Sequence, residues 1–390
     1  METKNMGLYI HIPFCKRKCK YCDFISYSNR EHLIDRYIEC LKYEIRDIGI
    51  SNLHDYKKGL DDLINLKTIY IGGGTPSVID SKYIKEILSE IKQNFKISSD
   101  VETTIEVNPG TVNETKLQDY KDAGINRLSI GLQSTNDNTL ERIGRIHTYE
   151  EFLNTYNLAR KIGFSNLNVD LMLALPEQNM EELTDGLEKV IELKPEHISI
   201  YSLILEEGTT LYKEIEEGKY VLTDDDMERK MYWKTKKMLE NTGYIHYEIS
   251  NFAKKGFESK HNLSCWNGEE YIGVGAAAHS YTNNVRYSNI GNIEEYINNF
   301  ENGKAIDNFV FHEKQTNESK MKDYMILGLR KIEGINIDIF KNKFFQNPLY
   351  LFRKELKQLI NEKLLIVDGN YIKLTDKGLD LANLVWEEFV

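Results

Sequence analysis

The chain has 390 residues, of which 41% are hydrophobic and 28% are charged, as in an ordinary globular protein with a buried core. Its formal net charge is −11, which argues against a general binder of nucleic acid or of anionic membrane, because such proteins need a basic surface. The five cysteines are too few and too clustered for a disulfide framework, and we find neither a signal peptide nor an apolar run of membrane-spanning length, so we expect a cytoplasmic protein.

Short β-branched runs alternate with segments of helical periodicity over the first two hundred residues. Apolar spacing predicts helices near Leu33 and Tyr83, and Gly124 and Gly163 follow helical runs as C-terminal capping glycines do. Such repetition implies a parallel sheet with right-handed crossovers. Six units predict an α/β fold, a partial (β/α)6 barrel, although periodicity alone also fits a doubly wound sheet. The predicted strands are residues 8–12, 68–71, 103–107, 127–132, 167–173 and 198–203.

The pattern changes after about residue 215. Residues 224–241 are predicted to form a helix that ends at Gly243, and a run rich in glycine and alanine follows at 271–280. We therefore divide the chain into three parts. These are a barrel at 1–215, an extension at 216–310 and a C-terminal domain at 311–390.

The C-terminal part is predicted to be an α+β region that ends in a winged-helix-like module. Helices are predicted near 337–345 and at 348–363, followed by a hairpin with the turn 368–370 and a final helix that runs to Phe389. From Ile337 onward there are eight basic and eight acidic residues. Since the charge is balanced, we expect a packing or partner module, with no nucleic acid as its ligand.

Three cysteines follow the first predicted strand in the spacing C-x3-C-x2-C: Cys15, Cys19 and Cys22. Thiolates are soft ligands that select zinc or iron–sulfur species over hard cations. A structural zinc site needs four ligands, usually in two short pairs, and no fourth cysteine lies nearby. A [4Fe-4S] cluster held by three thiolates keeps one iron open for an external ligand. The spacing therefore predicts such a cluster, with zinc completed by His11 as the alternative.

Glycines and polar residues stand at the ends of the later predicted strands. The turn 72–75, Gly-Gly-Gly-Thr, ends the second strand, and glycines permit close approach of the backbone to a ligand. Glu106 and Gln133 end the next two strands, and Arg145 follows twelve residues after Gln133. Asp170 lies inside an apolar strand, where a carboxylate is costly to bury unless it is paired or bound. Barrel proteins build their sites at this edge, so we predict a binding site, with ordinary buried ion pairs as the alternative.

The chain resembles the radical S-adenosylmethionine (SAM) superfamily, and more narrowly the HemN/HemW family. The matching text is Tyr-Ile-His-Ile-Pro-Phe-Cys at 9–15 and Tyr-Cys-Asp-Phe at 21–24, and the likeness extends over almost the whole chain. The resemblance implies a barrel of radical SAM type whose [4Fe-4S] cluster binds SAM at the open iron. It also implies that SAM contacts Tyr9, Gly73, Gly74, Thr75, Glu106, Gln133, Arg145 and Asp170, with Tyr21 beside the cluster.

Two branches of this family differ in function. The oxygen-independent coproporphyrinogen III oxidases carry C-x3-C-x2-C-x-C and an N-terminal extension. In this sequence Phe24 occupies the position of the fourth cysteine, and only fourteen residues precede Cys15. Both differences favour the HemW branch, whose members are regarded as heme chaperones.

The segment His-Asn-Leu-Ser-Cys-Trp at 261–266 resembles the HemW motif H-N-x-x-Y-W, which that branch links to heme binding. His261 is a candidate axial ligand of heme iron, and Trp266 a candidate to stack on the porphyrin. Cys265 replaces the tyrosine, and a thiolate can itself ligate heme. A histidine that supports a turn is the alternative for His261, and His279 is a secondary candidate. We expect a chaperone that passes heme to an unidentified acceptor protein, with a radical SAM reaction on a tetrapyrrole, such as coproporphyrinogen III oxidation, as the alternative.

Overall fold

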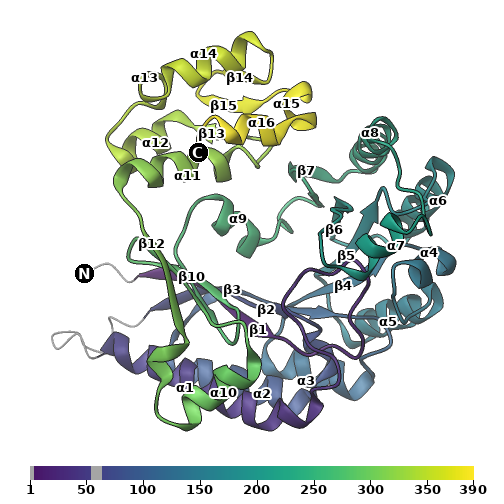
Figure 1. Ribbon diagram of the computed structural model, residues 1–390, viewed down its shortest axis with the longest axis vertical. Coiled ribbons are helices and arrows are strands. Elements are labelled where there is room, and N and C mark those ends of the chain that lie inside the picture. The colour runs from purple at the N-terminus through teal and green to yellow at the C-terminus, as the bar shows by residue number, and fades with distance from the viewer. Residues whose placement is uncertain (1–3, 54–63) are drawn as a thin grey trace.

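Six parallel strands form the centre of the computed structural model, which describes residues 4–53 and 64–390. Each strand pairs in parallel with the next one along the chain, and the sheet stays open (Figure 1). The predicted α/β fold with an open parallel sheet is confirmed. The strands are β1 (Asn5–Ile12), β2 (Asn65–Gly73), β3 (Lys96–Val107), β4 (Arg127–Gln133), β5 (Leu167–Leu173) and β6 (His197–Ser202).

Helices between these strands cover one face of the sheet, because the strands present apolar residues to that side. In β1, Leu8, Ile10 and Ile12 are fully buried at alternate positions, so the intervening residues face the other side. Gly124 and Gly163 end their helices in the left-handed conformation, at φ 103° and 93°, as predicted. The helices are α1 (Ile34–Leu53), α2 (Ser81–Asn94), α3 (Glu114–Ala123), α4 (Asp137–Arg142), α5 (Tyr149–Ile162) and α6 (Met180–Glu192), with 3-10 turns at Glu31–Leu33 and Pro76–Val78.

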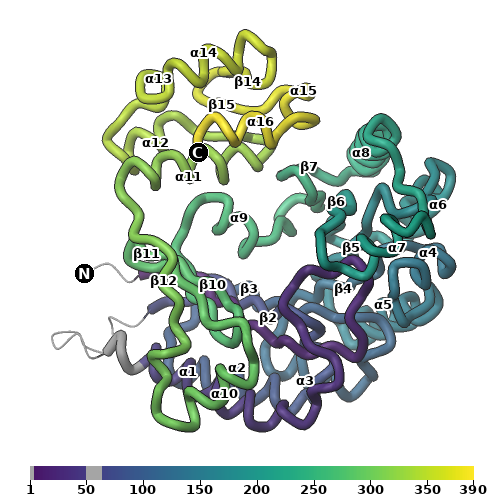
Figure 2. Tube along the Cα trace, in the orientation of Figure 1, coloured from purple at the N-terminus to yellow at the C-terminus, as the bar shows by residue number. Residues whose placement is uncertain are grey.

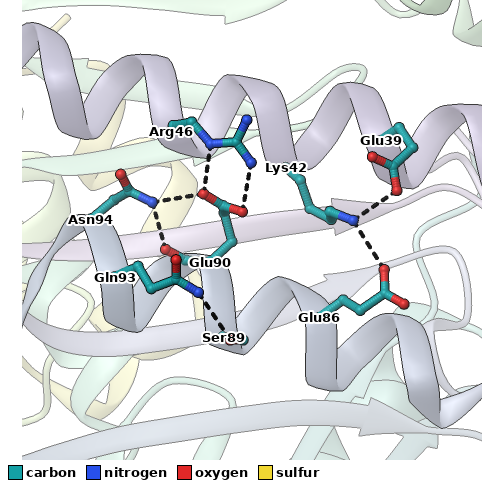
Figure 3. Close-up of polar contacts among 8 residues, drawn as sticks. All are labelled: Glu39, Lys42, Arg46, Glu86, Ser89, Glu90, Gln93 and Asn94. Atoms are coloured by element: carbon teal, nitrogen blue, oxygen red, sulfur yellow. Dashed lines mark hydrogen bonds and ion pairs between the residues drawn. The ribbon is translucent and has the colours of Figure 1, made fainter.

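Ion pairs join the outer surfaces of α1 and α2 (Figure 3). Lys42 Nζ lies 2.7 Å from Glu39 Oε1 and 3.1 Å from Glu86 Oε2. Arg46 donates through Nε and Nη2 to the two carboxylate oxygens of Glu90, at 2.9 and 2.8 Å. Solvent-exposed pairs of this kind contribute about 0–1 kcal/mol each, so the buried apolar faces of the two helices hold this layer on the sheet.

Six further strands extend the sheet at both edges, and the sequence did not predict them. One group of four adds to β1, the first parallel and the others antiparallel, and a pair of antiparallel strands adds to β6. Because both edge strands of the barrel are paired in this way, β1 and β6 do not meet (Figures 1 and 2). The added strands are β9 (Tyr271–Val274), β10 (His279–Thr282), β11 (Val285–Asn289) and β12 (Phe309–Lys314) beside β1, and β8 (Asn251–Ala253) and β7 (Ile245–Glu248) beside β6.

A short helix, α9 (Lys260–Trp266), lies on the face of the sheet opposite the covering helices (Figure 1). It begins at Ser259, whose side chain accepts a hydrogen bond from the backbone N–H of Asn262. The helix predicted at 224–241 is confirmed, with Asp224 as its N-cap. The other helices of this region are α7 (Thr210–Glu216), α8 (Asp225–Asn241) and α10 (Ile293–Glu301), with a 3-10 turn at Ala305–Asn308.

The C-terminal unit has its own hydrophobic core and a three-stranded sheet. The strands are β13 (Ile335–Asn336), β14 (Leu365–Asp368) and β15 (Tyr371–Leu374), and β15 lies between the other two. The predicted hairpin is confirmed, with Gly369 at φ 57° in its turn. Among the helices of the described chain, none is both long and apolar enough to span a membrane. The helices of this unit are α11 (Asn317–Gly328), α12 (Ile337–Phe344), α13 (Pro348–Leu351), α14 (Arg353–Asn361), α15 (Asp376–Asp380) and α16 (Ala382–Glu387).

Two helices of this unit were predicted as continuous, and that prediction was wrong. The segment 348–363 breaks at Phe352, which leaves the helical conformation at φ −102°, ψ 34°. The break turns the Phe352 side chain into the core, where its ring lies edge-on to those of Phe340 and Phe389. The last helix breaks in the same way at Leu381. Burial of an aromatic ring offsets the lost helical hydrogen bonds.

Candidate functional site

The three cysteines of the predicted cluster lie on the loop after β1. Cys15 is buried, and its backbone N–H donates to the carbonyl oxygen of Tyr27 at 2.9 Å. Cys19 and Cys22 are partly exposed, and the N–H of Cys22 donates to the carbonyl oxygen of Cys19 at 3.2 Å, which turns the loop back on itself. All three thiols are free of disulfides. The loop therefore presents three unpaired sulfurs at the carboxyl end of the sheet.

The arrangement does not suit a single metal ion. In the described part of the chain, no three His, Cys, Asp or Glu side chains converge as ligands of one ion. A cubane cluster places each thiolate on a different iron, so its cysteines need not converge. His11 does not complete a zinc site, because Nε2 must donate to the carbonyl oxygen of Ile25 at 2.9 Å and Nδ1 then accepts from the hydroxyl of Tyr9 at 2.9 Å.

The surroundings of the loop partly offset the cost of holding thiolates there. Burial raises the pKa of Cys15 and of Cys22 above the usual value for a thiol. A hydrogen bond from Thr75 lowers the pKa of Cys15, a backbone hydrogen bond from Phe24 lowers that of Cys22, and the ammonium group of Lys18 lowers both. The loop thus supplies donors and positive charge next to sulfur, as an anionic cluster requires.

A chain of hydrogen bonds joins Cys15 to Cys19 through residues that follow β2, β3 and α4. The hydroxyl of Thr75 donates to Cys15 Sγ at 3.6 Å and accepts from Asn108 Nδ2 at 2.9 Å. Asn108 Oδ1 accepts from Arg145 Nη2 at 2.8 Å, and Arg145 Nη1 donates to Cys19 Sγ at 3.6 Å. Sequence reasoning missed Asn108. The available signal was its position directly after the third predicted strand, beside Glu106.

The glycine turn passes the cysteine loop at distances that no side chain would allow. A Cβ atom at Gly74 would lie 2.9 Å from the carbonyl oxygen of Phe14 and 3.0 Å from Cys15 Sγ. At Gly73, which has φ +116°, it would lie 2.6 Å from the ring of His11. At Gly72 it would lie 3.0 Å from the carboxylate of Glu106. The turn is therefore glycine for steric reasons, and it leaves a side-chain-free wall beside the cysteines and Glu106.

Glu106 is a buried carboxylate on the same side of the sheet. Its Oε1 accepts from the hydroxyl of Tyr70 at 2.9 Å, and its Oε2 accepts from the N–H of Gly73 at 3.2 Å. Burial raises the pKa of Glu106 to about 7, and the negative charge of Asp170 adds to the rise. The group is therefore poised between its two protonation states near neutral pH.

Two of the other predicted SAM contacts carry buried polar atoms that have no hydrogen-bond partner in the described part of the chain. These atoms are Gln133 Oε1 and Arg145 Nε. Gln133 also adopts a left-handed backbone, at φ 73°, which is uncommon outside glycine and is typical of ligand sites. Asp170 accepts from Asn168 Nδ2 at 2.7 Å, and burial raises its pKa. An unpartnered buried polar atom is costly, so a polar ligand at this position would relieve that cost.

The two tyrosines predicted beside the cofactors are buried in the same region. Tyr9 stacks on Tyr70, with ring centroids 6.2 Å apart, and burial raises the pKa of its hydroxyl. Tyr21 packs against Ile143 and Met172, and burial also raises its pKa, with the charge of Arg145 lowering it. Neither phenol ionises at neutral pH, so both act as neutral donors or as packing surface.

His261 lies on α9 and packs against Thr68 and Tyr70 of β2. Its Nδ1 lies 2.9 Å from the hydroxyl of Thr68, and its backbone N–H donates to Glu102 Oε1 at 3.1 Å. Its ring stacks on Tyr70 with centroids 5.1 Å apart. Burial lowers the pKa of His261 to about 4, so the imidazole is neutral at pH 7. Among the described residues no hydrogen bond engages the other ring nitrogen, Nε2.

The remaining residues of the heme motif and the secondary histidine lie elsewhere on the same side. Burial raises the pKa of Cys265 to about 11, so the side chain is a neutral thiol. The ring of Trp266 packs against the guanidinium of Arg330 at 4.4 Å, which occupies one of its faces. His279 is exposed on β10 and stacks on His312 at 5.3 Å. The structure thus gathers the predicted cluster and SAM residues at one end of the barrel, and Tyr70 touches both Glu106 and His261.

Comparison with known proteins agrees with this geometry. The model of the Radical SAM superfamily matches residues 9–190, and that of the HemN C-terminal domain matches residues 315–381. The coproporphyrinogen III oxidase HemN of Escherichia coli shares the fold, with a TM-score of 0.85 and 22% identity over 99% of this chain and 90% of that one. The fold and the cysteine loop therefore define a radical SAM protein.

Two full-length relatives show which family of radical SAM proteins the chain belongs to. The heme chaperone HemW of Lactococcus lactis is 38% identical over 390 residues, which cover 100% of this chain and 98% of the relative. The heme chaperone HemW of Bacillus subtilis is 38% identical over 98% of each chain. The chain belongs to the HemW family, and the resemblance drawn from its sequence is confirmed.

Proposed function

We propose that this protein is a heme chaperone that holds a [4Fe-4S] cluster and SAM in its barrel, binds heme at α9 and passes it to an acceptor protein. The observation that carries the proposal is the full-length similarity to two proteins named heme chaperone HemW. The similarity to the oxidase HemN, at 22% identity, supports a common fold and is too low to assign the oxidase activity to this chain. Phe24 stands at the position of the oxidase's fourth cysteine, and the absence of that cysteine supports the chaperone over the oxidase.

In this proposal Cys15, Cys19 and Cys22 hold the cluster. When bound, a cluster with one open iron supplies an electron and a coordination position for the amino and carboxylate groups of SAM. The protein's own part is to place donors on the sulfurs. Thr75 and Arg145 donate to Cys15 and Cys19, and donors of this kind stabilise negative charge on the cluster.

The SAM site would lie between the glycine turn and the ends of β3 to β5. Glycines at the turn leave room for the ligand, and Glu106 and Asp170 are acceptors for its amino group and ribose hydroxyls. Arg145 provides a positive charge for the carboxylate of SAM, and the unpartnered Gln133 Oε1 provides one more acceptor. The proposed contacts are Tyr9, Gly73, Gly74, Thr75, Glu106, Gln133, Arg145 and Asp170, with Tyr21 beside the cluster.

The proposed heme ligand is His261. A histidine that binds iron must be neutral, and its other ring nitrogen is usually held by a hydrogen bond that fixes the ring orientation. His261 meets both conditions, because burial lowers its pKa to about 4 and Thr68 holds Nδ1. Nε2 is then the nitrogen that would bind the iron.

The proposal keeps the three-part division of the chain. Residues 1–215 would hold the cluster and SAM, residues 216–310 would carry the heme ligand, and residues 311–390 would contact the acceptor. The separate core of the C-terminal unit supports its role as a module. The proposal also keeps the cytoplasmic location, where a reducing environment leaves cysteines free to bind a cluster.

A heme titration of the anaerobically reconstituted full chain, followed in the Soret region, tests this proposal. The parent should give a distinct Soret band, and His261→Ala should weaken or shift it, because the axial ligand sets the electronic state of the iron. His246→Ala is the matched control. His246 is also buried, and burial also lowers its pKa to about 4, but it lies on β7, where its ring stacks on that of Phe252. Its variant should keep the parent's band.

Two results would contradict the proposal. One is a parent protein that binds no heme. The other is decarboxylation of coproporphyrinogen III by the parent when the cluster, a reductant and SAM are all present, which would make the chain an oxidase. A Soret band that is unchanged in His261→Ala would keep the chaperone function and move the ligand elsewhere, with His279 next to test.

A further inference from the structure

A cavity of about 210 Å³ lies at the C-terminal end of α9, where α9, the strands added to β1 and the C-terminal unit meet. Its walls combine five aromatic side chains with charged and polar ones. A second cavity, of about 690 Å³, adjoins it and shares its wall at β10 and α12. Together they have the size at which proteins bind organic cofactors, about 300–1,000 Å³. The aromatic side chains are Trp266, Tyr271, Tyr281, Tyr324 and Phe344.

Two lysines at both cavities lack an acidic partner. Lys343 Nζ donates only to backbone carbonyl oxygens, of Asn267 at 3.2 Å and of Gly268 at 3.4 Å. Lys320 Nζ donates to the neutral side chain of Asn284 at 3.0 Å. Neither lysine forms an ion pair with any residue that the structure describes. The charges of Glu269 and Glu270 act on Lys343 from a distance, and the Tyr324 ring lies 4.8 Å from its Nζ, but no carboxylate of the described residues is in ion-pair contact with either ammonium group.

A third donor at the cavity is also without an acceptor. The indole Nε1 of Trp266 is buried and has no hydrogen-bond partner among the described residues. Three acidic residues line the two cavities, and none of them forms an ion pair with Lys320 or Lys343. Glu270 is paired with Lys4. Asp323 is already paired with Arg286 at 2.5 Å, and burial raises the pKa of Glu269, which lies too far from Lys343 for an ion pair. An unmatched N–H and two unmatched ammonium groups call for an anionic ligand.

We propose that these cavities bind the edge of heme that carries its two carboxylates, with Lys320, Lys343 and the Trp266 N–H as donors. This inference rests on the proposed function, because heme is the cargo. Heme joins a flat apolar ring to two carboxylates on one edge, and the aromatic walls and the three donors match these two parts. Cys265, which lines the cavity, follows four residues after His261, about 6 Å along α9. The cavity and the proposed axial ligand therefore belong to neighbouring turns of one helix.

The test compares two ligands, ferric heme and its dimethyl ester, in which both carboxylates are blocked. Equilibrium affinities are measured for the reconstituted full chain by titration in the Soret region. The parent should bind heme more tightly than the ester, because only heme presents anions to the lysines. Lys320→Gln and Lys343→Gln should each weaken the binding of heme about tenfold and leave that of the ester unchanged.

Lys341→Gln is the matched control, because Lys341 lies on the same helix as Lys343 and pairs with Asp338 outside the cavity. It should leave both affinities unchanged. Equal affinity of the parent for heme and ester would overturn the inference, as would equal weakening of both ligands by the lysine variants. In either case heme binding itself, and the proposed function, would stand. A parent that binds neither ligand would overturn both.

Discussion

Replacing Glu106 with glutamine tests whether SAM binding depends on the carboxylate in the barrel. Burial raises the pKa of Glu106 to about 7, so the group is mostly protonated at pH 6 and mostly ionised at pH 8. Only the ionised form offers all its oxygen lone pairs to the amino group and hydroxyls of SAM. The affinity for SAM should therefore rise with pH and become constant above about pH 8.

The size of the effect follows from the pKa. With a pKa of about 7, the ionised fraction rises about tenfold between pH 6 and pH 8, which corresponds to about 1.4 kcal/mol of binding free energy. The amino group of SAM titrates in the same range, since α-amino groups have pKa values of about 7.7–8.0. Its contribution affects parent and variant alike. The ratio of their affinities isolates the part that comes from Glu106.

The assay is equilibrium binding of SAM to anaerobically reconstituted protein at pH 6, 7 and 8, with iron content measured in each sample. Glu106→Gln should bind more weakly than the parent at pH 8 and should approach it at pH 6. Glu90→Gln is the control, because Glu90 is also largely buried but pairs with Arg46 on the helical layer. Parallel affinity curves for parent and Glu106→Gln would refute the reasoning, since they would show that Glu106 does not titrate in this range.

Three further predictions concern the cysteines and their surroundings. Cys19→Ala should abolish cluster loading, measured as iron and sulfide content. Cys40→Ala should retain the cluster, because that thiol is buried beside α10. Stoichiometric zinc without sulfide in the parent would contradict the presence of a cluster. Thr75→Val should lower the reduction potential of the cluster by about 20–60 mV in a redox titration, since it removes one donor from Cys15 Sγ. Thr235→Val, at a buried hydroxyl without a partner, should not change it, and an equal potential in both variants would show that the Thr75 bond has no effect. Cys265→Tyr restores the family motif H-N-x-x-Y-W and should bind heme at least as well as the parent. A lost or shifted Soret band would instead identify Cys265 as a ligand.

The sequence was sufficient for the barrel, because its strands are long and their apolar residues alternate. Leu8, Ile10 and Ile12 already define a buried face without knowledge of the neighbours. The strands added to β1 and β6 were missed for the opposite reason. They are only three to six residues long, and β10 reads His-Ser-Tyr-Thr, which has no apolar face. Pairing with an existing edge, rather than local preference, makes such segments strands.

The residues of the candidate site also fall into those that local sequence patterns predict and those that they do not. The cysteine spacing and the glycine turn are local patterns, so the sequence was enough to propose them as a unit. Asn108 and Tyr70 were missed because their roles exist only in the fold. Asn108 gains its role when the ends of three chain segments bring it between Thr75 and Arg145. The residue spacing of a single sequence does not show such long-range contacts.

The position of Tyr70 has a consequence for how two ligands would influence each other. Its hydroxyl donates to Glu106 and its ring stacks on His261, so one rigid side chain separates the proposed SAM site from the proposed heme ligand. If SAM changes the affinity for heme by some factor, heme must change the affinity for SAM by the same factor, because the two routes to the doubly bound protein have equal total free energy. The protein with bound heme would then have a different affinity for SAM from the protein without heme.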